Sequence, residues 1–188
     1  MTFVPLGNLM SGHSKWSQIK RKKAAVDEKK GKVFSKLART IEIAARKGAD
    51  PKTNFTLREV IEKAKAANMP ALNIERAIKK GDEALSAKGG PAAGWEEIWY
   101  EAYGPGGVAI LIKTITQNRN RTVAELKHIL SKNGGVLAEA GSVKWQFDEK
   151  GGAKFPVAAQ EKDAAALRNL LAELEDEEDV QEIFTNQK

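Results

Sequence analysis

The sequence predicts an α+β protein in which an N-terminal helical bundle domain is followed by an α+β sandwich domain. In the first half of the chain, apolar residues recur at the three- and four-residue spacing of helices. From residue 97 onward, β-branched and aromatic runs predict strands. A stretch without periodicity separates the two halves. We therefore expect an extension over residues 1–9, a basic helical domain over 10–81, a linker over 82–94 and an α+β domain over 95–188.

Three apolar stripes predict the helices of the first half. Their members are Phe34, Leu37, Ala38, Ile41, Ala44 and Ala45; then Leu57, Val60, Ile61 and Ala64; then Ile74, Ala77 and Ile78. Gly48 ends the first stripe, Pro70 suits the first turn of the third helix, and Gly81 is expected to end it. A short basic helix is also expected around Trp16.

The second half alternates strand and helix signals. Gly104-Pro-Gly-Gly107 joins two apolar runs as a hairpin turn. The expected elements are strands over 97–103 and 108–116, a helix behind a Thr122–Glu125 capping box, strands over 143–147 and near 154–158, a helix with Leu167, Leu170, Leu171 and Leu174, and a strand over 180–184. The helices should cover one sheet face.

Charge is distributed unevenly along the chain. Residues 10–47 carry twelve Lys and Arg against three Asp and Glu, whereas residues 160–188 carry three basic and nine acidic residues. A basic head and an acidic tail suggest that one end meets a polyanion and the other is kept away from it.

Many cations of the basic head lack an acidic residue at helical i,i+4 spacing, so phosphates are their natural partners. A solvated helical face is the alternative interpretation. Trp16 fits either a base-stacking role or a core anchor. The candidate nucleic-acid-binding residues here are Lys15, Trp16, Lys20, Arg21, Lys22, Lys23, Lys29, Lys30, Lys32, Lys36 and Arg39.

Arg119 and Arg121 form a second candidate group between a strand and a helix. Two guanidinium groups near a helix N-terminus can clamp a phosphate. A polar loop whose side chains hold backbone carbonyls explains the same residues equally well.

The sequence argues against catalysis. It has no cysteine, and its two histidines, His13 and His128, show neither metal-ligand spacing nor a catalytic motif. We therefore expect no enzyme activity, no cofactor, no metal and no small-molecule substrate.

No apolar run reaches the ~20 residues of a membrane helix, and the first residues do not resemble a secretory signal, so we expect a cytoplasmic protein without a membrane partner.

Ordered motifs along the chain resemble the YebC/PmpR family, which includes the mitochondrial translational activator of cytochrome c oxidase. These motifs are Gly12-His-Ser-Lys-Trp16, Lys20-Arg-Lys-Lys-Ala24, Gly31-Lys-Val-Phe-Ser-Lys-Leu37, Gly48-Ala-Asp-Pro51, Asn68-Met-Pro70, Asn73-Ile-Glu-Arg-Ala-Ile-Lys-Lys-Gly81, Tyr103-Gly-Pro-Gly-Gly107, Asn118-Arg-Asn-Arg-Thr122 and Gly141-Ser-Val143.

The resemblance implies a cytoplasmic, non-enzymatic protein with a helical N-terminal domain and two α+β domains. It also favours Met10 as the usual start. Family members carry a third domain inserted before the last helix, and residues 151–161 are too short to hold it. We therefore expect a two-domain, shortened member.

The expected function is that of a non-catalytic, DNA-binding transcriptional regulator. The alternative is a ribosome- or ribosomal-RNA-associated translation factor that assists elongation at difficult sequences such as proline runs. A protein-interaction adaptor is a third possibility. No helix-turn-helix or zinc-finger pattern for base reading is evident, so physical reasoning favours the ribosome, whereas family descriptions favour DNA.

Overall fold

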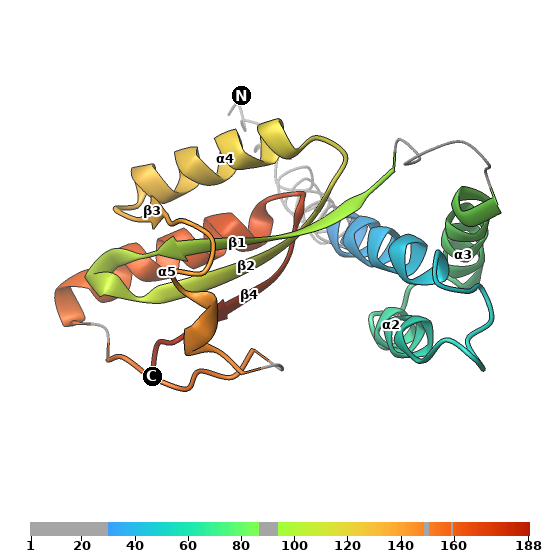
Figure 1. Ribbon diagram of the computed structural model, residues 1–188, viewed down its shortest axis with the longest axis horizontal. Coiled ribbons are helices and arrows are strands. Elements are labelled where there is room, and N and C mark those ends of the chain that lie inside the picture. The colour runs from blue at the N-terminus through green and yellow to red at the C-terminus, as the bar shows by residue number, and fades with distance from the viewer. Residues whose placement is uncertain (1–29, 87–93, 149–150, 159) are drawn as a thin grey trace, which may run out of the picture.

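The computed structural model describes residues 30–86, 94–148, 151–158 and 160–188, and it confirms the α+β fold class. Figure 1 shows a helical unit beside a sheet that carries two further helices. The elements are a helix over 30–45, α2 (Phe55–Ala66), α3 (Ala71–Ser86), β1 (Glu96–Tyr103), a 3-10 turn (Pro105–Gly107), β2 (Ala109–Thr116), α4 (Arg119–Lys132), β3 (Val136–Leu137), a 3-10 turn (Lys144–Gln146), α5 (Glu161–Asp176) and β4 (Val180–Thr185). The expected extension over 1–9 and the short basic helix around Trp16 lie outside these residues.

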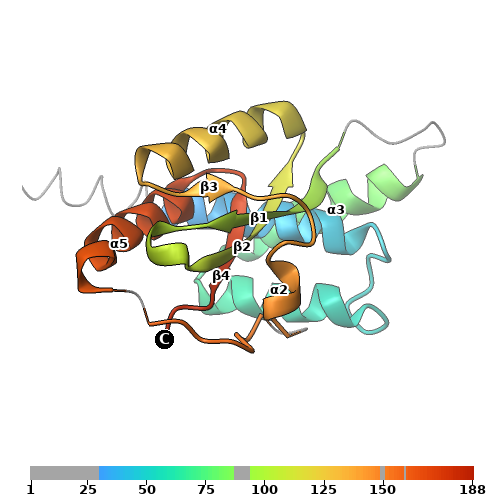
Figure 2. The same cartoon turned by 60° about the vertical axis from the view of Figure 1, so that its left-hand side comes forward.

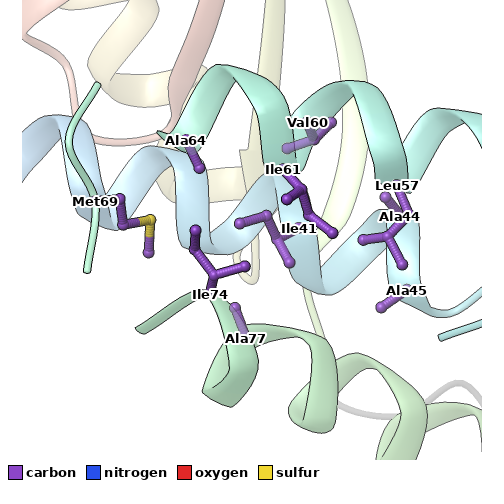
Figure 3. Packing of buried hydrophobic residues seen from close by; sticks show 10 residues of the cluster. All are labelled: Ile41, Ala44, Ala45, Leu57, Val60, Ile61, Ala64, Met69, Ile74 and Ala77. Carbon is purple, nitrogen blue, oxygen red and sulfur yellow. The ribbon is translucent and has the colours of Figure 1, made fainter. Parts of the chain in front are cut away.

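The helical unit packs the predicted apolar stripes against one another (Figure 3). All four members of the second stripe are buried on α2, and Asn54 caps this helix by accepting the Leu57 N–H. The core residues are Ile41, Ala44, Ala45, Leu57, Val60, Ile61, Ala64, Met69, Ile74 and Ala77. The helical spacing therefore located this core correctly.

Gly81 does not end its helix, because α3 continues to Ser86. A Cβ atom at Gly81 would overlap the Glu42 carbonyl oxygen and lie 2.7 Å from the Ala45 Cβ. The glycine therefore lets α3 approach the 30–45 helix closely. The prediction failed because a glycine needed for close packing looks, in sequence, like a glycine that stops a helix.

The sheet is antiparallel, with strand order β3-β1-β2-β4. Figures 1 and 2 show α4 and α5 together on one side of it. Leu126 and Leu130 of α4 and Leu170 of α5 are fully buried there against sheet residues such as Ile112. The hairpin, the leucine-rich last helix and the final strand therefore follow the prediction.

The opposite sheet face is covered in part by the chain between β3 and α5. Residues 143–147 do not form the predicted strand but a 3-10 turn, in which Val143 and Phe147 are buried while Trp145 is 59% exposed. The backbone N–H groups of Gly141, Val143 and Lys144 bind the buried Glu101 carboxylate instead of a strand. The edge position beside β1 belongs to β3.

Residues 154–158 likewise form no strand. This stretch is tied to the C-terminal segment by the isolated bridge between Val157 and Gln187. No helix among the described residues is long and apolar enough to cross a membrane.

Candidate nucleic-acid interface

The structure brings the two candidate cation groups together. Lys30, Lys32, Lys36 and Arg39 lie on the 30–45 helix, and Arg119 and Arg121 lie in the first turn of α4. Members of both groups contact the acidic residues at the end of α5 and just before β4: Lys32, Lys36 and Arg39 from the first group and Arg121 from the second. The other candidates, Lys15, Trp16, Lys20, Arg21, Lys22, Lys23 and Lys29, lie outside the described residues.

Asp179 is the point at which the two groups join. Its side chain is fully buried, and Oδ1 accepts from Arg39 Nη1 at 3.3 Å. Oδ2 accepts from Arg121 Nη2 at 2.7 Å and from Thr122 Oγ1 at 2.8 Å. One carboxylate thus connects the helical unit, the start of α4 and the start of β4.

The Arg39 guanidinium makes further contacts with Glu178 and Trp95. Its Nη1 donates to the Glu178 carbonyl oxygen at 2.7 Å, its Nη2 pairs with the Glu178 carboxylate, and its guanidinium carbon lies 4.3 Å from the centroid of the Trp95 ring. The side chain is only 9% exposed. Arg39 therefore links the two units and offers little surface to a polyanion.

Two lysines of the 30–45 helix also contact the acidic residues at the end of α5. Lys36 Nζ donates to the Glu175 carbonyl oxygen at 2.6 Å, and burial lowers the pKa of Lys36 despite the nearby Glu177 and Asp176. Lys32 Nζ lies 3.5 Å from Asp176 Oδ1. The expectation that these cations lack carboxylate partners is therefore wrong for Lys32 and Arg39, and Lys36 is also engaged. Their partners are far away in sequence, where helical spacing gives no information.

The start of α4 also differs from the prediction. Asn118, not Thr122, caps the helix, because its Oδ1 accepts the Arg121 N–H at 3.1 Å. The arginines therefore lie in the first helical turn. Arg119 is 66% exposed and only 3.9 Å from Glu96 Oε2, whereas Arg121 is bound to Asp179.

Asp179, Glu125 and Glu177 are the described carboxylates that come near enough together to suggest a metal site, with ligand atoms within 4.8 Å of one another. Burial and the neighbouring Glu177 raise the pKa of Glu125. Arg121 already supplies a positive charge, because its guanidinium contacts Asp179 and lies 4.0 Å from Glu125. The cluster is explained as an ion-pair network.

Asp179 and Glu101 are functional residues that the sequence does not reveal. Asp179 ends a run of acidic residues, a pattern typical of a solvated face, and Glu101 lies in a strand without an evident partner. Burial and three backbone N–H donors distinguish Glu101: burial alone would raise its pKa, but the hydrogen bonds from Gly141, Val143 and Lys144 bring the pKa below its usual range. Only the fold reveals either environment.

Two family models match the chain. Residues 14–84 match the model described as "TACO1/YebC protein N-terminal domain", and residues 95–163 match "TACO1/YebC second and third domain".

Similar proteins cover most of the chain. A "probable transcriptional regulatory protein" of Desulforamulus reducens is 61% identical over 143 residues, which are 76% of this chain and 57% of that protein. One of Chlorobaculum parvum is 51% identical over 94% of this chain and 69% of its own length. The chain thus spans little more than half of the first relative. The crystal structure of the conserved hypothetical protein Aq1575 from Aquifex aeolicus is similar with a TM-score of 0.76 and 33% identity, covering 93% of this chain and 97% of that one.

Proposed function

The chain belongs to the TACO1/YebC family. On that premise, we propose that it is a non-catalytic regulator of gene expression that binds DNA through its basic N-terminal segment, residues 10–47. The names of its relatives as probable transcriptional regulatory proteins support the regulatory part of the proposal. The cytoplasm is the compartment in which we expect it to act.

The observation that carries the proposal is an excess of positive charge over the internal partners. Residues 10–47 hold twelve basic and three acidic residues, and the acidic segment 175–179, which contacts Lys32, Lys36 and Arg39, adds five carboxylates. One of these, Asp179, is shared with Arg121. This excess of positive charge favours phosphates as partners, because neutralising them releases counterions and favours binding.

The described surface is consistent with this role. Lys30 is exposed, the Lys32 side chain is 44% exposed, and Arg119 is 66% exposed. Exposed ion pairs such as those of Lys32 and Arg119 contribute about 0–1 kcal/mol, so a phosphate can replace the carboxylate at small cost. Arg39 and Arg121 belong to the internal network and are expected to act on binding only indirectly.

One observation favours the ribosome as an alternative target. Arginine is the residue best suited to bidentate recognition of guanine, and both Arg39 and Arg121 are committed to Asp179. The cations left on the 30–45 helix are mainly lysines, which suit phosphate contacts and shape recognition of folded RNA. The second candidate function is therefore a ribosome-associated translation factor.

Binding of the full chain to labelled promoter duplex and to purified ribosomes, each with competitor nucleic acid, separates these functions. The DNA proposal predicts sequence-selective duplex binding that survives competitor. Duplex binding that is uniform across sequences, together with ribosome binding that survives competitor, would contradict it in favour of the translation factor.

The double variant Lys20→Glu with Arg21→Glu tests the basic segment in the same assays. We expect weaker binding to every nucleic acid, whereas the matched control Lys127→Glu, at an exposed lysine of α4, should bind as the wild type does. Equal binding by all three proteins would exclude the basic segment as the contact and favour the adaptor function.

A further inference from the structure

The sheet face opposite α4 and α5 contains a cavity that the proposed function does not use. It has a volume of about 520 Å³ and is lined by Trp99, Lys113 and Phe184 from three strands and by Lys144 and Lys154 from the covering segment. The strand register places Trp99 beside Lys113, and Leu111 beside Phe184, on this face. The cavity therefore combines aromatic rings with ammonium groups.

Two aromatic pairs lie in the lining of this cavity or next to it in sequence. Trp99 is 39% exposed and stacks on Phe184, with ring centroids 5.9 Å apart and planes inclined by 23°. A second pair lies next in sequence to the lining lysines: Trp145 is 59% exposed, Phe155 is 55% exposed, and their centroids are 5.5 Å apart. Four rings in two pairs, three of them substantially exposed, offer flat apolar surfaces to a planar ligand.

The uncommitted charge at this cavity is positive. Among the described residues, neither Lys144 Nζ nor Lys154 Nζ has a hydrogen bond or ion pair, and both side chains are exposed. The two acidic lining residues are engaged: Asp148 Oδ1 accepts the Gly152 N–H at 2.7 Å, and Glu182 lies 3.5 Å from Lys63 Nζ. An anionic ligand therefore meets two exposed lysines here.

Glu101 fixes one part of this surface. Its carboxylate accepts the Lys144 backbone N–H at 2.9 Å and holds the loop before Trp145. The Trp145 indole N–H donates to the Ser142 carbonyl oxygen at 2.9 Å, which orients the ring. Less conformational freedom is therefore lost when a ligand binds.

We propose that this sheet face binds single-stranded nucleic acid, with bases stacked on Trp99 and Trp145 and phosphates at Lys144 and Lys154. Base–aromatic stacking requires unpaired bases, because the faces of bases in a duplex are already covered by their neighbours. The exposed Lys144 and Lys154 favour a polyanion over an apolar protein partner. This site uses none of the basic residues on which the proposed function rests, so it is tested independently of them.

Binding of the full chain to fluorescein-labelled 12-nucleotide oligo(U), oligo(dT) and a DNA duplex tests the proposal. We expect both single strands to bind, with quenching of tryptophan fluorescence by stacked bases. A preference for oligo(U) over oligo(dT) would identify RNA as the source of the strand, and the reverse preference would identify DNA. Absence of binding to both strands would overturn the proposal.

Matched variants locate the contact. Trp145→Ala should weaken single-strand binding by roughly tenfold, whereas Trp145→Phe, which keeps an aromatic face, should stay near the wild type. Lys144→Glu with Lys154→Glu should weaken binding and reduce the salt slope by about 1.4, since each single-strand phosphate contact contributes about 0.7. Leu72→Ala, at an exposed leucine of α3, and Lys127→Glu are the controls and should not change binding.

The two proposals fail in different ways. If Lys20→Glu with Arg21→Glu leaves duplex binding unchanged, the proposed function of the basic segment fails while the sheet-face site stands. If Trp145→Ala and the double lysine variant both bind single strands like the wild type, this site is excluded, and the exposed rings are left to a protein partner.

Discussion

Asp179 and Glu101 are two buried carboxylates that are stabilised by different kinds of partner. Asp179, at the junction of the two units, is surrounded by the side chains of Arg39, Arg121 and Thr122. Glu101, in the α+β unit, receives the backbone N–H groups of Gly141 and its neighbours. The first carboxylate therefore joins distant elements, whereas the second shapes a loop.

Whether a buried carboxylate binds basic side chains or backbone N–H groups determines which cations remain available to a phosphate. Asp179 draws two candidate arginines into the structure and so withdraws them from polyanion binding. Glu101 makes its hydrogen bond with Lys144 through the backbone N–H, and the charge of the exposed Lys144 side chain only adds to lowering the pKa of Glu101. Burial and pairing, rather than residue type, determine which basic residues can hold a phosphate.

The largest expected effect is that of Asp179→Asn. The change leaves the buried Arg39 guanidinium without its full countercharge, and breaking a buried pair costs about 3–5 kcal/mol. Urea unfolding should show a loss of free energy in this range. The matched control Asp176→Asn, at a side chain that is 72% exposed, should change stability by less than about 1 kcal/mol. Similar losses in both variants would contradict the junction role of Asp179.

Glu101→Gln should lower the free energy of unfolding by about 1.5–3 kcal/mol near neutral pH, because charge-assisted hydrogen bonds to the loop become neutral ones. Since the pKa of Glu101 is lowered in the fold, its stabilisation is present above the ordinary glutamate pKa and is lost as the pH falls through the folded value. Urea unfolding of both proteins across the acid range should therefore show their difference shrinking. A difference that stays constant into strong acid would exclude this origin.

Arg121→Ala and Arg119→Ala compare two neighbours in the same helical turn. Arg121 donates to the buried Asp179, so its loss should cost about 1–3 kcal/mol. Arg119 is 66% exposed, so its loss should cost less than about 0.5 kcal/mol. Thermal and urea unfolding measure both. Equal costs would mean that the Arg121 contact does not stabilise the junction.

Glu101→Gln should also have a small effect on ligand binding. A looser loop should hold Trp145 and Lys144 less firmly and weaken oligo(U) binding by about threefold, through the ordering cost of the loop. Fluorescence titration measures this change, with Glu182→Gln, an exposed change at the same cavity, as a control that should not weaken binding. Binding that is unaffected by Glu101→Gln would separate the loop geometry from the ligand contact.

Much of the fold follows from local patterns. The stripe of Leu57, Val60, Ile61 and Ala64 forms the buried side of α2, and the apolar run around Ile112 forms the central strand β2. Residues 143–147 fail as a strand because alternation alone does not show where backbone hydrogen bonds go, and here the Glu101 carboxylate takes them. Local periodicity therefore specifies burial better than it specifies backbone pairing.

The candidate sites were harder to predict than the fold. The sequence placed Arg39 and Arg121 in two separate groups of candidate phosphate-binding residues, and their shared partner Asp179 is 140 and 58 residues away in the chain. The sequence does not mark Lys144 and Lys154 as candidates, because Trp99 and Phe184, which line the same cavity, come close to them only in the folded protein. Both cases depend on contacts between distant segments, which composition and spacing do not encode.

The salt dependence of duplex binding tests most directly whether the basic segment binds phosphates. Affinities of the wild type and of Lys20→Glu with Arg21→Glu are compared over a range of salt concentrations on one labelled duplex. We expect a double-logarithmic slope that is shallower by about two units in the variant, since each lost phosphate contact removes about 0.9. Parallel slopes would show that Lys20 and Arg21 do not bind phosphates and would overturn the proposed function of the basic segment.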